Sequence, residues 1–409
     1  MRNVLAFAAV CTLFLSGCTN TGDDGRFHDR LLVLDAHADI ELADAPTRYA
    51  RPDGVSRVDP SLMAEGGVDA VVMAIGVGPG PRDAAGVAEA RTRADAELAA
   101  VQALAADPAT NTVIATSAGA VTSTVASGKM ALILGFQNAR SLGKDVDAID
   151  TFYNAGVRVF ALTHMGHNDF ADSSRPVYIG EKKAYEPEAE HGGLSDLGRE
   201  AVKKLNALGA VIDVSQLSKQ ATLQVLDQST APVIASHSNV QALSNVRRNL
   251  SDEEIDRIGE NGGVIHVAAF RGYLFDSNDE NLHNRIVAAR REAGLPDKYD
   301  YPYELYWEIE GYENQVAYTS AISEILGPGD VEAIVDHIHY IVKRIGFDHV
   351  GIGNDFNHGG GIEGFSDASG ARVITDALVR RGYGEEEIAK IWGGNFLRVM
   401  AAAEAAAQR

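Results

Sequence analysis

The sequence predicts an α/β protein built on a (β/α)8 barrel of the TIM type. Eight short apolar segments rich in β-branched residues alternate with helical segments along the chain, and most of the apolar segments end in polar side chains. No glycine-rich nucleotide-binding loop follows any of them. Strands separated by helices pair in parallel through right-handed crossovers, and eight such units close a barrel.

The predicted strands are nearly continuous apolar runs, which is the pattern of strands buried on both faces. They cover residues 31–39, 68–77, 130–138, 157–165, 210–216, 232–238, 262–270 and 349–356. Helical patterns fill the intervals, for example at 87–106, 195–208, 218–228 and 331–345. Because one helix cannot account for the interval before the eighth strand, we expect an insertion around residues 271–328. Its aromatic residues either pack together, cover the site or contact another copy of the chain: Tyr301, Tyr303, Tyr306, Trp307 and Tyr312.

The polar residues at the strand ends predict where the functional site lies. They are His37, Asp39, Gln137, His164, Gln216, His237 and Asp355. In a closed barrel the carboxyl ends of all strands meet at one rim, where enzymes of this fold carry their active sites. An open sheet would not bring the first and eighth strands together, so the predicted site depends on closure of the barrel.

The first 17 residues have the pattern of a bacterial lipoprotein signal peptide. Arg2 precedes the apolar run 4–15, which ends in Leu-Ser-Gly-Cys with Cys18 as the residue to be lipidated. An ordinary cleaved signal with a chance cysteine is the alternative. We expect an exported lipoprotein on the periplasmic face of a bacterial membrane, with the outer membrane favoured in a Gram-negative cell.

Three segments follow from this pattern: a signal peptide at 1–17, a lipidated N-terminus and tether at 18–30, and a single barrel domain at 31–409. Cys11 and Cys18 are the two cysteines, so the mature chain has no disulfide framework. The net charge of −21 argues against a nucleic-acid partner and against a polybasic membrane contact.

His37 and Asp39 form the first part of a candidate metal site. Residues i and i+2 of a strand face the same side, so both side chains point to the barrel mouth and offer a nitrogen and an oxygen to a divalent cation. Asp355 ends the eighth strand, next to the first. It either completes this metal site or accepts a proton from metal-activated water; a structural role in capping the following glycine-rich loop is the alternative.

Four segments of the sequence closely resemble the membrane (renal) dipeptidase family of zinc metallopeptidases. They are LDAHAD at 34–39, VRVFALTHMGHNDFADSS at 157–174, GLSDLGREAVKKLNALGAVIDVSQLS at 193–218 and APVIASHSNVQALSNVRRNLSDEEI at 231–255. The resemblance extends over nearly the whole mature chain. It implies a (β/α)8 barrel, two bridged zinc ions and hydrolysis of dipeptides, including some with a D-residue in second position.

The same resemblance implies roles for individual residues. His37 and Asp39 would share one metal with Asp355, and His237 would hold the second metal. His164 would polarise the scissile carbonyl, and Arg248 would bind the substrate carboxylate.

Two positions depart from the family pattern. Gln137 stands where the family has a glutamate that bridges both metals, and Gln216 where it has a histidine ligand of the second metal. A neutral amide is a poor bridge between two cations. The sequence therefore predicts one zinc ion rather than two, with Gln137 and Gln216 as doubtful ligands. His167 and His358 lie near the same mouth as possible substitutes.

We therefore expect a metal-dependent hydrolase that cleaves the amide bond of small peptides by metal-activated water. The alternative is a repurposed family member with a reduced metal site, which binds or matures a peptide-derived molecule without ordinary dipeptidase activity. A noncatalytic surface binding protein is a third possibility, because a fold alone does not decide function. The expected partners are a small peptide, the membrane through Cys18, and a second copy in a homodimer.

Overall fold

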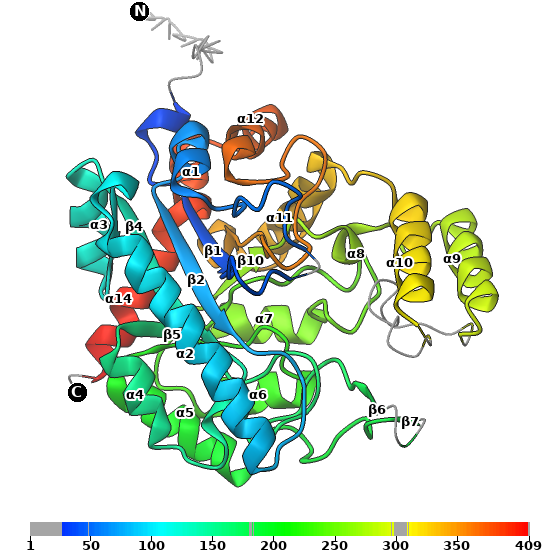
Figure 1. The fold of residues 1–409 in the computed structure, drawn as a ribbon. Helices are drawn as coiled ribbons and strands as arrows, with labels where there is room; N and C mark the ends of the chain where they lie inside the picture. The colour runs from blue at the N-terminus through cyan, green and yellow to red at the C-terminus, as the bar shows by residue number, and fades with distance from the viewer. Residues whose placement is uncertain are drawn as a thin grey trace, which may run out of the picture.

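The computed structural model describes residues 27–407 apart from 48, 180–181, 183, 296, 298–308 and 310. It confirms the predicted (β/α)8 barrel, with eight parallel strands in the order β1-β2-β4-β5-β8-β9-β10-β11 (Figure 1). These are β1 (Leu34–Asp39), β2 (Ala70–Gly76), β4 (Met130–Gln137), β5 (Val157–Ala161), β8 (Val211–Asp213), β9 (Ile234–Ala235), β10 (Val264–Val267) and β11 (Val350–Ile352).

The barrel closes between its first strand and the segment after its last. The Asp39 N–H donates to the carbonyl of Phe356 at 2.9 Å, and the Asp355 N–H donates to the carbonyl of His37 at 3.0 Å. Asp35 adds a buried side-chain link, since its carboxylate accepts the backbone N–H and the side-chain amide of Asn354, both at 2.9 Å. Closure of the barrel therefore places the polar residues at the end of β1 beside those that follow β11.

Several strands are shorter than the sequence predicts. His237 and Asp355 lie two and three residues beyond β9 and β11, in the loops at the rim. The sequence analysis also missed β3 (Thr112–Ile114), which pairs with the first half of β4. The second half of β4 pairs with β5. A small hairpin, β6 (Tyr178–Ile179) and β7 (Ala184–Tyr185), lies in the long loop after β5.

The helices around the barrel begin and end where the local sequence dictates. Asp83, Ser195 and Ser218 each accept a backbone N–H in the first turn of a helix, and Gly209 ends one of these helices with φ 70°. The helices are α1 (Pro60–Gly66), α2 (Ala84–Ala106), α3 (Ala118–Ala126), α4 (Ala148–Asn154), α5 (Asp196–Leu208), α6 (Lys219–Gln228), α7 (Asp252–Glu260), α11 (Val331–Ile345), α12 (Arg372–Arg381), α13 (Glu385–Ala389) and α14 (Asn395–Ala407).

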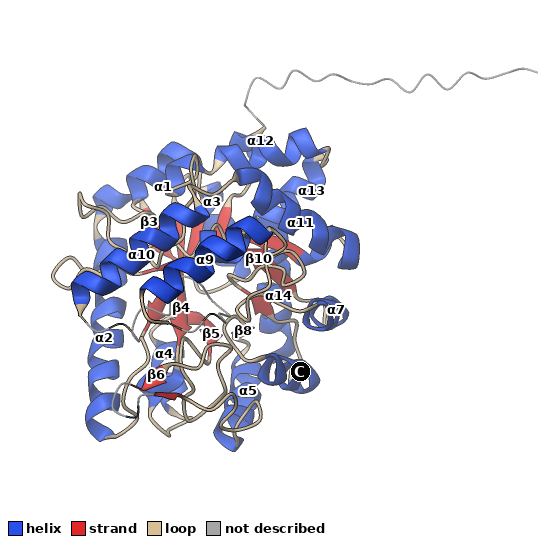
Figure 2. Ribbon diagram, turned by 90° about the vertical axis from the view of Figure 1, so that its right-hand side faces the viewer, coloured by secondary structure: helices blue, strands red, loops and turns tan. Residues whose placement is uncertain are grey.

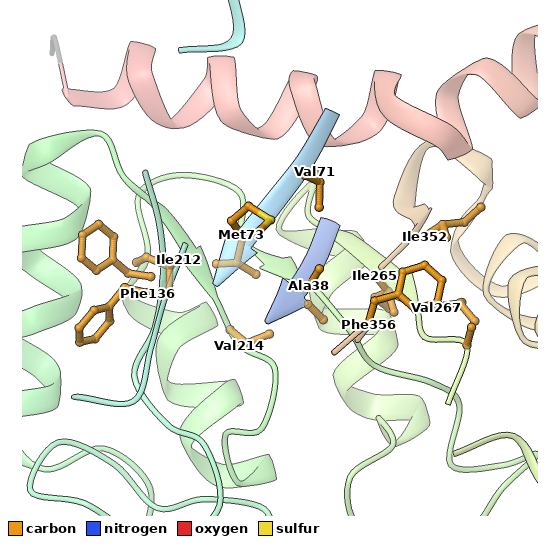
Figure 3. Packing of buried hydrophobic residues seen from close by; sticks show 14 of the residues in the cluster. Ala38, Val71, Met73, Phe136, Ile212, Val214, Ile265, Val267, Ile352 and Phe356 are labelled. Carbon is orange, nitrogen blue, oxygen red and sulfur yellow. The ribbon is translucent and has the colours of Figure 1, made fainter. Parts of the chain in front are cut away.

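Apolar side chains of the strands make up a continuous buried core with the surrounding helices. Figure 3 shows part of it, where Val71 and Met73 of β2 lie beside Ala38 of β1. On β1, Leu34, Ala36 and Ala38 alternate with Asp35, His37 and Asp39, so this strand presents an apolar face and a polar face. Burial of the apolar face against the helices leaves the polar face at the barrel mouth.

The segment between β10 and α11 contains three helices, α8 (Arg271–Leu274), α9 (Glu280–Glu292) and α10 (Tyr312–Leu326). Helices α9 and α10 lie side by side and stand away from the barrel (Figures 1 and 2). They pack through a small apolar cluster of their own that includes Ile286, Tyr318 and Ile322. Tyr312 is 72% exposed. The other aromatics named above, Tyr301, Tyr303, Tyr306 and Trp307, lie outside the described residues.

The predicted signal peptide, Cys18 and most of the tether also lie outside the described residues. Among the helices that the structure describes, none combines the length and the apolar character needed to cross a bilayer.

The buried side chain of His337 forms a hydrogen bond that we expect to be sensitive to acid. Its Nδ1 accepts the Val240 N–H at 3.0 Å, and burial lowers the pKa of this histidine to about 3. Since the folded pKa lies below that of the unfolded chain, the contribution to stability is present above about pH 6.5 and is lost as the pH falls. At pH 5 we expect a loss of about 2 kcal/mol relative to pH 7 from this group alone.

Unfolding by urea at both pH values measures this loss. A His337→Asn variant keeps an acceptor for the Val240 N–H but does not titrate. Between pH 7 and pH 5 its free energy of unfolding should therefore fall by about 2 kcal/mol less than that of the wild type. An identical acid dependence in the two proteins would show that His337 is not the group responsible.

Candidate metal centre

His37 and Asp39 lie together on the polar face of β1, as the spacing predicts. His37 Nε2 lies 3.2 Å from Asp39 Oδ1. His358, in the loop after β11, approaches the other side of Asp39, with Nδ1 2.7 Å from Oδ2. Asp39 thus lies between two imidazoles.

Asp355 reaches the same place from the far end of the chain, with Oδ1 4.0 Å from His37 Nε2. It has φ 59°, a left-handed conformation that is uncommon for a residue other than glycine. The turn after it explains this conformation, because the N–H groups of His358 and Gly360 donate to the Asp355 carbonyl. Asp355 therefore organises the glycine-rich loop and also faces His37.

His237 completes the cluster. Its ring stacks on that of His37 at a centroid distance of 3.7 Å. One ligand atom from each of His37, His237 and Asp355 lies within 4.8 Å of the others, the geometry of a possible metal site within the described part of the chain. The structure thus places His237 beside the site that the sequence assigned to the first metal.

Ser236 and Asp213 orient both histidines. The Ser236 hydroxyl donates to Asp213 Oδ2 at 2.5 Å, so its oxygen accepts Nδ1–H from His237 at 2.7 Å and from His37 at 3.2 Å. Asp213 also accepts the backbone N–H groups of Ser215 and Ser236. With Nδ1 carrying the proton, His37 presents Nε2 to a metal, whereas His237 Nε2 faces the amide nitrogens of Gln216 and Gln137.

The two glutamines that depart from the expected pattern lie next to His237. Gln216 Nε2 is 3.1 Å and Gln137 Nε2 is 3.4 Å from His237 Nε2. Gln216 also has a left-handed backbone, with φ 68°, and its Oε1 accepts an N–H of Arg175 at 2.7 Å. Gln137 Oε1 is buried with no hydrogen-bond partner among the described residues.

A cavity of about 250 Å³ opens beside this cluster. Its polar lining includes Asp39, Glu97, Gln137, His164 and His358. The rings of His164 and His358 meet edge to face at 4.9 Å. His164 Nδ1 is buried and has no hydrogen-bond partner within the described part of the chain.

Arg248 lies behind His237 and is 2% exposed. Its guanidinium donates to the His237 carbonyl at 2.5 Å and to the Ser238 hydroxyl at 2.9 Å, and it lies over the Tyr273 ring. His167 serves the fold instead, because both of its ring nitrogens are used by backbone groups, Ser173 N–H and Pro187 O.

Burial and charge set the protonation of this site. Burial opposes the charged form of His37, but the Asp39 hydrogen bond and the nearby carboxylates outweigh it and raise its pKa. Burial also opposes ionisation of Asp39, yet His358 and His37 lower its pKa. Burial lowers the pKa of His164 and His237 far below the usual range, so both are neutral imidazoles near pH 7.

The donor set around His37 fits a divalent cation. Ligand atoms about 2.1 Å from a tetrahedral zinc are about 3.4 Å apart, close to the 3.2 and 4.0 Å that separate His37 Nε2 from Asp39 and Asp355. The same carboxylates raise the pKa of His37, which shows that positive charge is favoured between these groups. The second position does not fit, because amide N–H groups of Gln137 and Gln216 point at His237 Nε2.

A closed barrel of eight strands with histidines and carboxylates at its carboxyl rim is the architecture of metallohydrolases. The model of one family, membrane dipeptidase (peptidase family M19), matches residues 25–409. The chain therefore belongs to the membrane dipeptidase family.

Curated relatives of the chain include two fungal dipeptidases. It is 30% identical to dipeptidase tcpJ of Claviceps purpurea over 281 residues, 67% of this chain and 51% of that protein. It is 27% identical to dipeptidase aclJ of Aspergillus oryzae over 274 residues, with 67% and 51% covered. The chain thus spans about half the length of the curated relatives it matches.

Two solved structures share the fold. The probable dipeptidase PvdM from Pseudomonas aeruginosa has a TM-score of 0.82 and 35% identity, with 93% of this chain and 97% of that one covered. A metallo peptidase from Rhodobacter sphaeroides, liganded with a phosphinate mimic of L-Ala-D-Ala, has a TM-score of 0.69 and 22% identity, with 91% and 99% covered.

Ser236 provides a test of the orienting contacts. Ser236→Ala removes the acceptor for Nδ1–H of both histidines, so we expect zinc affinity to fall about tenfold. Titration calorimetry of the metal-free protein with zinc measures this change. Ser244→Ala is the matched control, because this buried hydroxyl has no partner among the described residues. Equal zinc affinity in the two variants would contradict the role of Ser236.

Sequence reasoning missed Asp213, Ser236 and Arg175. A signal for Asp213 was present, since an aspartate inside a strand buried on both faces needs partners. Arg175 gave no such signal, because it lies in a loop, 41 positions from the glutamine it contacts.

Proposed function

We propose that the protein is a metal-dependent dipeptidase that hydrolyses the amide bond of small peptides with a single zinc ion. One observation carries the proposal: His37, Asp39 and Asp355, from opposite ends of the barrel sequence, meet at one rim beside a small cavity. Family membership supports the same reaction.

His37, Asp39 and Asp355 would hold the ion, with His237 next to them. A divalent ion bound there supplies Lewis-acid activation of water and of the scissile carbonyl. Asp39 keeps its negative charge through its contacts with His358 and His37. The ligand oxygens therefore provide charge compensation for a cation at near-neutral pH.

The remaining residues would bind and orient the peptide. His164, as a neutral imidazole lining the cavity, can donate a hydrogen bond to the carbonyl oxygen and so stabilise the charge that develops there. Arg248 is the cation that the substrate carboxylate would approach. A cavity of about 250 Å³ suits a small substrate, so dipeptides are the proposed class, including those with a D-residue second.

Metal content and hydrolysis test the proposal together. Elemental analysis of purified protein should give one zinc per chain, and a screen of L,L and L,D dipeptides with added zinc should show hydrolysis. Tight binding of peptides without hydrolysis of any of them would instead favour the repurposed family member. If the protein neither binds nor hydrolyses any of these peptides, the third possibility, a noncatalytic surface protein, is favoured.

We further propose that the protein is an exported lipoprotein anchored through Cys18 on the periplasmic face of a bacterial membrane. The sequence Leu-Ser-Gly-Cys after an apolar run supports this. In cells given a labelled fatty acid, the wild type should carry label and sediment with membranes. Cys18→Ala should lose the label, whereas Cys11→Ala should keep it; label retained in Cys18→Ala would disprove the assignment.

A further inference from the structure

Arg175 is a buried cation that contacts Gln216, the residue that stands where the family resemblance implies a ligand of the second metal. Its guanidinium donates to Gln216 Oε1 at 2.7 Å. The backbone of Arg175 is held from two sides, because its carbonyl accepts the Gly166 N–H and its own N–H donates to Ser173 Oγ. Ser174 N–H donates to the Gln216 carbonyl at 2.9 Å. The loop after β5 and the end of β8 therefore set the position of this side chain.

The Arg175 contact fixes the orientation of Gln216. A guanidinium only donates hydrogen bonds, so the Gln216 atom facing it is the oxygen. The amide nitrogen then faces His237 and donates to its Nε2 at 3.1 Å. The lone pair of His237 that a second metal would need is already used.

The charges around Gln216 also disfavour a second divalent cation. The side chains that a second cation would require, a glutamate at 137 and a histidine at 216, are replaced by neutral amides. A buried, permanently charged guanidinium lies behind one of them. A second divalent ion would therefore face amide N–H groups and a fixed positive charge.

We propose that Arg175, held by Gln216, takes the place of the second metal as a permanent cation. The inference deepens the proposed function, on which it rests. The chain then binds one metal ion, while the second position keeps a positive charge at every metal concentration. Arg175 acts through Gln216 and His237 and is a positioning residue.

Metal stoichiometry of four proteins tests this inference. The proteins are the wild type, Gln137→Glu with Gln216→His, the same double variant with Arg175→Met, and the double variant with Arg199→Met. Arg199 is the matched control, because it also donates to a glutamine oxygen, that of Gln224. Each protein is dialysed against buffered zinc, and bound zinc per chain is measured.

We expect one zinc in the wild type, one in the double variant, two when Arg175 is also removed, and one with the Arg199 control. Zinc content of the wild type tests the proposed function, whereas the gain from the double to the Arg175 triple variant tests the inference, so the two fail separately. A second zinc in the double variant, or no gain in the triple variant, would overturn the inference. If Arg175→Met does not fold, Arg175→Gln, which keeps an N–H donor, replaces it.

Discussion

Asp39→Asn is expected to lower kcat/KM for a hydrolysed dipeptide by about 10³-fold. The substitution removes a negatively charged oxygen 3.2 Å from His37 Nε2 and keeps the size of the side chain. Lewis-acid stabilisation by a bound cation contributes several kcal/mol to the transition state, and about 4 kcal/mol corresponds to about 10³-fold in rate. Zinc bound per chain should fall in parallel.

Initial rates over a range of dipeptide concentrations, with zinc in excess, measure this effect. Asp44→Asn is the matched control, since it makes the same chemical change at an exposed position of the loop after β1 and should leave the rate unchanged. The melting temperature of both variants shows whether the fold is intact. Hydrolysis at the wild-type rate by Asp39→Asn would remove Asp39 from the metal site and end the proposed mechanism.

Arg248→Lys is expected to lower kcat/KM by about 10²-fold, chiefly through a higher KM. The guanidinium donates to the His237 carbonyl and the Ser238 hydroxyl at once, which fixes its plane. A lysine keeps the charge but not this two-point contact, and a misplacement of about 1 Å at a binding group can cost about 10²-fold.

Arg247→Lys is the control for this change. Arg247 is adjacent in sequence, but it forms a surface ion pair with Glu188, a contact that contributes little to stability. Dipeptides with a free carboxylate and their C-terminal amides should be compared in both variants. The wild type should prefer the free carboxylate, and Arg248→Lys should lose that preference. An unchanged preference would show that the substrate carboxylate does not meet Arg248.

The sequence predicted the barrel well because its signals are local. Alternation of apolar runs with amphipathic segments identified all eight barrel strands. The β3 strand escaped notice because three residues are too few to show a periodicity. The short β9 and β11 were overestimated, since the prediction extended each strand to the polar residues at the rim, which lie in loops beyond the last strand residue.

The sequence predicted which residues form the site, but it did not predict the hydrogen bonds that orient them. Polar residues at strand ends pointed to His37, Asp39, His237 and Asp355, and the structure brings them together. The hydrogen-bond chain from Asp213 through Ser236 to two imidazoles was not predictable, because it joins three strands that are distant in sequence.

By itself the sequence determined the barrel, the identity of the rim residues and the presence of glutamine at positions 137 and 216. Tertiary structure alone decided how Gln216 is oriented, since it placed the Arg175 guanidinium against Gln216 and turned the Gln216 amide toward His237. The physical reason is that periodicity and caps depend on neighbours a few residues apart. The direction of a buried hydrogen bond, in contrast, depends on which donor the folded chain brings to each acceptor.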